Sequence, residues 1–78
     1  MKEVEGIKME SVLSSNIRQI GYDRVEKTLQ VNFKNNRNYQ YCPVSLETYK
    51  ELRVAESFGK YLNAKILSNC EIKYIQIK

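Results

Sequence analysis

The sequence predicts an α+β domain: an antiparallel sheet of three to four strands with two short helices packed on one face. Apolar and polar residues alternate over Thr28 to Phe33, the period of a strand with one buried face. After residue 43, two segments place apolar residues at helical spacing, each behind a serine. Strands, then helices, then a strand is an order typical of this fold class. The 78 residues are expected to form a single domain over 1–78.

The strands are placed by alternation and by the turns between them. Residues 1–15 are weakly patterned and are expected to form an edge strand or a packed loop. Residues 17–23 are predicted as a strand, ended by the polar turn 23–27. Residues 28–34 form the next strand and 37–42 return from it, while Glu71 to Lys78 supplies a final apolar strand.

The turn at Asn35-Asn36 decides which face Tyr39 and Tyr41 occupy, because one residue of register moves every side chain to the other face. A two-residue turn would place both rings on the polar face. A three-residue turn, with Asn36 left-handed in a bulge, pairs Val31 with Tyr39 and Leu29 with Tyr41. We favour the second register, because it gives one continuous apolar face and keeps Asn38 and Gln40 out of the core.

Two serines mark the helix starts. Ser45 is a good N-cap, with Val44 and Tyr49 placed as a hydrophobic staple, and this helix is expected to run to about Ala55. Its inward stripe is Tyr49 and Leu52. Ser57 is positioned to cap a second helix with its own apolar stripe, which Ser68-Asn69 ends. The residues of that stripe are Phe58, Tyr61, Leu62 and Ile66, with Lys65 at the same spacing.

Composition limits the classes of function. Thirteen basic and nine acidic residues give a net charge of +4 and a pI near 9.1, a mild bias towards polyanions. With no histidine, and with Cys42 and Cys70 far apart, we expect no metal site and no cofactor. The cysteines are expected to be reduced and buried, although one disulfide is possible. The polar N-terminus and the lack of a long apolar run indicate a cytoplasmic protein without a membrane segment.

Residues 12–66 resemble the KTSC domain, a segment found at the C-terminus of some lysyl-tRNA synthetases and as small free-standing bacterial and phage proteins. The matching motifs are Ser14-Ser15-Asn16-Ile17, Ile20-Gly21-Tyr22-Asp23, Leu29-Gln30-Val31-Asn32-Phe33, Tyr39-Gln40-Tyr41, Val44, Tyr49 with Leu52, and Gly59-Lys60-Tyr61-Leu62-Asn63. The attachment to a synthetase implies RNA binding for this chain.

The chain also departs from the family pattern. Cys42 and Pro43 stand where an aromatic and a polar residue are common, and Leu62 stands where Phe is usual. Residues 67–78 lack the usual basic ending and form a divergent strand instead. If the basic ending holds RNA, part of that contact surface is absent from this chain.

Three sets of residues are candidates for nucleic-acid or anion binding. Tyr39 and Tyr41 could stack bases, although the favoured register makes them core residues. Arg18, Lys34 and Arg37 are expected near the hairpin end, where they would contact phosphates or simply keep a solvated edge from aggregating.

The third set lies at the start of the second helix. Ser57, Gly59 and Lys60 could hold an anion with free backbone amides, room for close approach and a full charge, although a plain helix cap needs the same serine. Asn16 and Asn63 could cap a helix or contact a ligand.

We expect no catalysis, because the chain lacks histidine, paired carboxylates, a base for either cysteine and a glycine-rich phosphate loop. The sequence therefore predicts a non-catalytic binding module, with RNA or single-stranded nucleic acid as the leading partner. The alternative is a protein-interaction module that binds a host protein or forms a homodimer through its C-terminal strand.

Overall fold

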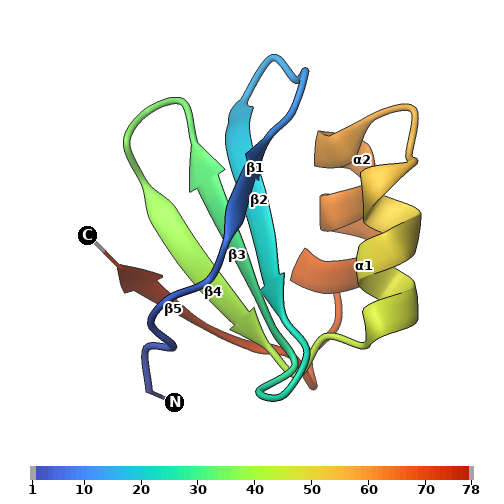
Figure 1. Cartoon of the computed structure of the whole chain (residues 1–78). Coiled ribbons are helices and arrows are strands. Elements are labelled where there is room, and N and C mark those ends of the chain that lie inside the picture. Colours follow the sequence, from blue (N-terminus) through green and yellow to red (C-terminus); the bar gives the residue numbers. More distant parts are fainter. Residues whose placement is uncertain (1, 78) are drawn as a thin grey trace.

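Five antiparallel strands form one twisted sheet, and the helices cover one of its faces in the computed structural model, which describes residues 2–77 (Figure 1). The strands are β1 (Met9–Ser11), β2 (Ile17–Asp23), β3 (Thr28–Phe33), β4 (Asn38–Cys42) and β5 (Lys73–Ile77). Their order in the sheet is their order in the chain. The helical elements are α1 (Leu46–Arg53), α2 (Phe58–Leu62) and η1 (Asn63–Leu67).

The fold class is confirmed as α+β, but the expectation of three to four strands is wrong. The predicted C-terminal strand forms as β5 and pairs with β4, and the weakly patterned N-terminal segment forms an edge strand, β1, which pairs with β2 and brings the number of strands to five. β1 has only three residues and little alternation, so its sequence carried almost no strand signal. The last predicted strand begins at Lys73 rather than Glu71, and its final residue, Lys78, lies outside the described residues.

The β3–β4 turn has the three-residue form that the sequence favoured. The amide of Phe33 donates to the carbonyl of Arg37 at 2.9 Å, and Asn36 has a φ of 66°. An asparagine adopts this left-handed conformation more readily than most residues. The resulting register pairs Leu29 with Tyr41 and Val31 with Tyr39.

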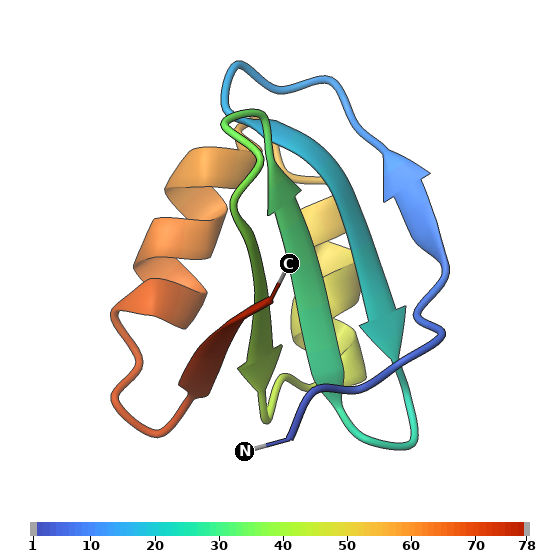
Figure 2. The ribbon, with the colours of Figure 1, turned by 90° about the vertical axis from the view of Figure 1, so that its left-hand side faces the viewer.

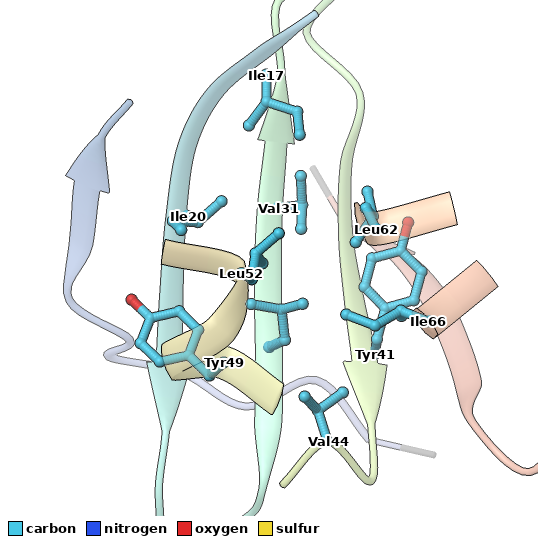
Figure 3. Close-up of a cluster of buried hydrophobic side chains, with 10 residues drawn as sticks. Ile17, Ile20, Val31, Tyr41, Val44, Tyr49, Leu52, Leu62 and Ile66 are labelled. Atoms are coloured by element: carbon cyan, nitrogen blue, oxygen red, sulfur yellow. The ribbon is translucent and has the colours of Figure 1, made fainter. Parts of the chain in front are cut away.

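The core lies between the apolar face of the sheet and the helices (Figure 3). Strands β2 and β3 contribute Ile17, Ile20, Leu29 and Val31, all fully buried. The helices face them with Leu52 of α1, Leu62 of α2 and Ile66 of η1. These three positions were predicted by the helical spacing, which places residues three or four apart on one side of a helix.

Both serine caps form. The Ser45 hydroxyl accepts from the amide of Thr48 at 3.1 Å, and the Ser57 hydroxyl accepts from the amide of Lys60 at 3.3 Å. Helix α1 ends at Arg53, two residues before the predicted Ala55. Helix α2 continues into η1, a wider turn in which the Ser68 amide donates to the carbonyl of Asn63, five residues back.

The other face of the sheet carries a chain of amide side chains and is partly covered by the N-terminal segment (Figure 2). The Gln40 side-chain amide makes two hydrogen bonds to the backbone of Val4, as a neighbouring strand would. It accepts from the Val4 amide at 2.8 Å and donates to the Val4 carbonyl at 2.7 Å. The chain continues from Gln40 to Gln30, then to Asn32, then to Gln19, at 2.9, 3.0 and 3.1 Å. The register keeps Gln40 out of the hydrophobic core, as predicted, but the sequence did not indicate that this side chain is fully buried on the opposite face, under the N-terminal segment.

The cysteine expectation is also corrected. Both thiols are free, but Cys70 is exposed and Cys42 is only half-buried. The Cys42 thiol donates to the carbonyl of Glu26 at 3.3 Å. Cys70 lies in the turn between η1 and β5, outside the helices and strands that form the core.

Gly21 is required by the approach of the N-terminal segment to β2. A Cβ atom there would lie 2.6 Å from the Lys8 carbonyl oxygen and 2.6 Å from the Met9 sulfur. We expect Gly21→Ala to lower the free energy of unfolding by about 1–3 kcal/mol, because the segment has to move away. Gly59→Ala is the matched control: a Cβ there meets nothing within 4 Å, so the change should be neutral or slightly stabilising. Urea unfolding measures both, and equal midpoints for the two variants would contradict this role of Gly21.

Gln40 should hold the N-terminal segment on the sheet. We expect Gln40→Leu to lower the free energy of unfolding by about 1–3 kcal/mol, because Val4 and Gln30 lose their buried partner. Hydrogen exchange at the Val4 amide should accelerate in the same variant. Gln76→Leu, an exposed change on β5, is the control and should leave both values unchanged. Unaltered exchange at Val4 in Gln40→Leu would refute the assignment.

Candidate functional site

The β1–β2 loop, the β3–β4 turn and the start of α2 lie at the same end of the domain (Figure 1). A groove is lined by residues of all three. It consists of two adjoining hollows of about 390 and 510 Å³, which share Ser15, Asn16 and Phe33. We call it the hairpin-end groove. It is lined by residues 14–17, residues 33–35 and the helical residues Ser57, Gly59, Lys60, Leu62, Asn63 and Leu67.

Hydrogen bonds fix two walls of the hairpin-end groove to each other. The Lys34 amide donates to the carbonyl of Asn16 at 2.8 Å, which joins the β3–β4 turn to the β1–β2 loop. Within the loop, the Ser14 hydroxyl accepts from the amides of Asn16 and Ile17, each at 3.3 Å. The loop is therefore built as an ST turn, and Asn16 is held by its backbone with its side chain exposed.

The groove is basic. Lys34 lines one hollow and Lys60 the other, and both side chains are exposed. None of the described residues that line it is acidic. Arg18 and Arg37 flank the same turn: the Arg18 guanidinium donates to the Asn36 side-chain oxygen at 3.4 Å, and the Arg37 amide donates to that of Asn35 at 3.1 Å. The structure thus places the four predicted basic residues at one end of the molecule.

The predicted anion-binding residues, Ser57, Gly59 and Lys60, all line the groove. The cap already uses part of this helix start, because Ser57 accepts from the Lys60 amide through its hydroxyl and from the Tyr61 amide through its carbonyl. The space beside Gly59 is open, because a Cβ atom there would meet nothing within 4 Å. Asn63 and Asn16, the other two polar candidates, line the groove as well.

The two predicted tyrosines have different environments, although both lie on the apolar face of β4. Tyr41 is only 4% exposed, and burial raises the pKa of its phenol to about 12. It is a core residue with no face free for stacking. Tyr39 is half-buried, with the Phe33 ring 5.9 Å away, edge-on, and the Tyr74 ring 6.0 Å away.

Sequence reasoning missed two residues of this region. Phe33 appeared there only as a member of the buried stripe, yet it is half-buried and lines both hollows of the groove. Tyr74 appeared only as an apolar residue of the last strand, yet its side chain is 65% exposed. Knowledge that β5 pairs with β4 would have placed Tyr74 near the other aromatic residues, because this pairing sets Tyr74 opposite Tyr41.

A second cavity, of about 540 Å³, lies at the other end, beside the β2–β3 turn and the N-terminal segment. Its charged residues have mixed signs: Lys2, Lys73, Glu3, Glu5 and Glu26. Over residues 2–77, no three side chains of the metal-binding types gather closely enough to hold a metal ion. None of the helices in that range has the length and apolar character needed to cross a bilayer.

The fold and the groove together define a small α+β domain of the single-sheet type, with helices on one face and a basic, open groove at one end. A family model described as the KTSC domain matches residues 13–69. The chain belongs to the KTSC domain family.

Individual relatives agree with this assignment. A protein of Tsukamurella paurometabola is 38% identical over 55 residues, covering 70% of this chain and 82% of its own. An uncharacterized protein of Stutzerimonas stutzeri is 33% identical over 57 residues, covering 73% and 80%. The crystal structure of a KTSC domain protein from Yersinia pestis superposes with a TM-score of 0.84 at 25% identity, covering 94% of this chain and 100% of that one.

Proposed function

We propose that this chain is a non-catalytic binding module whose ligand is RNA or single-stranded nucleic acid, held in the hairpin-end groove. One observation carries the proposal: separate elements bring Lys34, Lys60, Arg18 and Arg37 to one end of the domain, around a groove whose described lining residues include no acid. Phosphates supply most of the affinity of nucleic acids for proteins, and exposed lysines and arginines are their usual partners.

The geometry suits a backbone that passes along the groove. Lys34 and Lys60 lie in adjoining hollows, so one strand can contact both ammonium groups in succession. The backbone at Gly59, which has open space beside it, offers further donors to phosphate or sugar oxygens, with Ser57 and Asn63 nearby. The KTSC segments attached to lysyl-tRNA synthetases support the same ligand class. From the same family resemblance, we propose that this chain is a bacterial or phage protein that acts in the cytoplasm.

RNA binding should depend on salt and on the lysines of the groove. We expect a single-stranded RNA oligonucleotide to bind in fluorescence anisotropy, with log K falling as log salt at a slope of about −0.7 per phosphate contact. The double change Lys34→Ala with Lys60→Ala should weaken binding about tenfold or more at low salt and flatten that slope. Arg24→Ala with Lys50→Ala removes the same number of positive charges, two, at exposed positions that do not line the groove, and this control should bind as the unaltered chain. Full affinity in the lysine variant would contradict the site, and no binding at low salt would overturn the function.

One observation favours a second candidate, a protein-interaction module. Within residues 2–77, strand β5 is the last strand of the sheet and pairs with β4 alone, so we infer that its outer edge is available to a partner strand or to a second copy of the chain. Such an interface would be nearly insensitive to salt and would be lost in Ile75→Pro, which removes a backbone donor from the edge strand. Sedimentation of the chain at high and low salt distinguishes this candidate from the first.

A further inference from the structure

We propose that Tyr74 is the base-stacking residue of this module, and that the groove therefore selects unpaired nucleotides over duplex. This inference rests on the proposed function and names its ligand class. Tyr74 lies on β5, outside residues 13–69 matched by the family model. None of the sequence motifs used to identify the site includes it.

The strand register sets the direction of the Tyr74 ring. Tyr74 is the direct partner of Tyr41 across β4 and β5, and opposed residues of an antiparallel pair share a face of the sheet. Tyr74 therefore lies on the face that carries the core and the helices. The helices stop short of it, because β5 is the edge strand and the Tyr74 side chain is 65% exposed whereas Tyr41 is 4% exposed.

Neighbouring rings hold Tyr74 in place without covering it. Its ring centroid is 6.0 Å from that of Tyr39, at 65°, and 6.2 Å from that of Tyr41, at 41°. Tilted and edge-on contacts of this kind are favourable and leave much of a ring open. A large aromatic side chain that is ordered and exposed at once suits stacking, since every base offers a π-face.

The rings connect Tyr74 to the basic groove. Tyr39 contacts Phe33 edge-on at 5.9 Å, and Phe33 lines both hollows between Lys34 and Lys60. A path of three aromatic residues thus runs from the cations to the edge of the sheet. A strand whose phosphates meet the two lysines can extend along this path and place a base on Tyr74.

This arrangement distinguishes single strands from duplexes. In a duplex the base faces are already stacked on one another, so phosphates, sugars and base edges remain for contact but no base face is free for an aromatic ring. The lysines would bind both forms, whereas Tyr74 contributes only when a base is free. Stacking of one base on an aromatic side chain contributes about 1–3 kcal/mol, which is about a 5- to 150-fold change in affinity.

Because the chain has no tryptophan, Tyr74→Trp introduces a single fluorophore at the proposed contact. We expect its emission to be quenched on titration with a uridine-rich single-stranded RNA, and to change little with an RNA duplex of the same length. Val25→Trp is the matched control, at a position 88% exposed in the β2–β3 turn, and it should not respond to either RNA. Quenching equal to that of the control would overturn the assignment of Tyr74.

Affinities measured on the same two RNAs complete the test. Tyr74→Ala should weaken single-strand binding about tenfold and leave duplex binding unchanged, while Tyr74→Phe should bind like the unaltered chain. A thermal melt of each variant checks the fold. If Tyr74→Ala binds the single strand normally while the double lysine variant loses affinity, the stacking inference is wrong and the proposed function stands. If the unaltered chain binds neither RNA, both are wrong.

Discussion

The left-handed conformation of Asn36 is the constraint on which the rest of the structure depends. It makes the β3–β4 turn three residues long, and the turn length fixes which side chains of β4 face the helices. A shift of one residue would exchange Tyr41 with Gln40, placing a buried amide against leucines and a phenol against the amide chain. In the observed register, the apolar side chains of β4 pack against the helices and Gln40 joins the hydrogen-bonded amides of the other face.

That register also determines which face of the sheet packs against the helices and which face carries the hydrogen-bonded amides. The helices α1, α2 and η1 cover the apolar face over β2 and β3, whereas Tyr39 of β4 is half-buried and Tyr74 of β5 is exposed. On the opposite face, the amide side chains from Gln19 to Gln40 are hydrogen-bonded to one another and, through Gln40, to the N-terminal segment. Polar side chains that bond one another in this way are poor candidates for a ligand. The surfaces on which we propose that the ligand lies are the hairpin end and the β5 side of the helical face.

Much of the fold could be predicted from local signals. The two serine caps, the Asn35-Asn36 turn and the stripes containing Leu29 and Leu52 are short-range features, each with its own stereochemical cause. The features that could not be predicted depend on contacts between segments that are distant in the sequence. The burial of Gln40 requires Val4 to reach β4, and the exposure of Tyr74 follows from the place of β5 at the edge. The groove was predicted only as two separate sets of residues, at the hairpin end and at the start of the second helix, because its hollows form where the β1–β2 loop, the β3–β4 turn and α2 meet.

A titration followed by amide chemical shifts tests the central claim most directly. The unaltered chain, labelled with nitrogen-15, is titrated at low salt with a uridine-rich single-stranded RNA. The account predicts that the largest changes lie at Asn16, Lys34, Lys60 and Tyr74, with the β2–β3 turn and Val4 unchanged. Changes centred on that turn or on the N-terminal segment, or no changes at all, would contradict it.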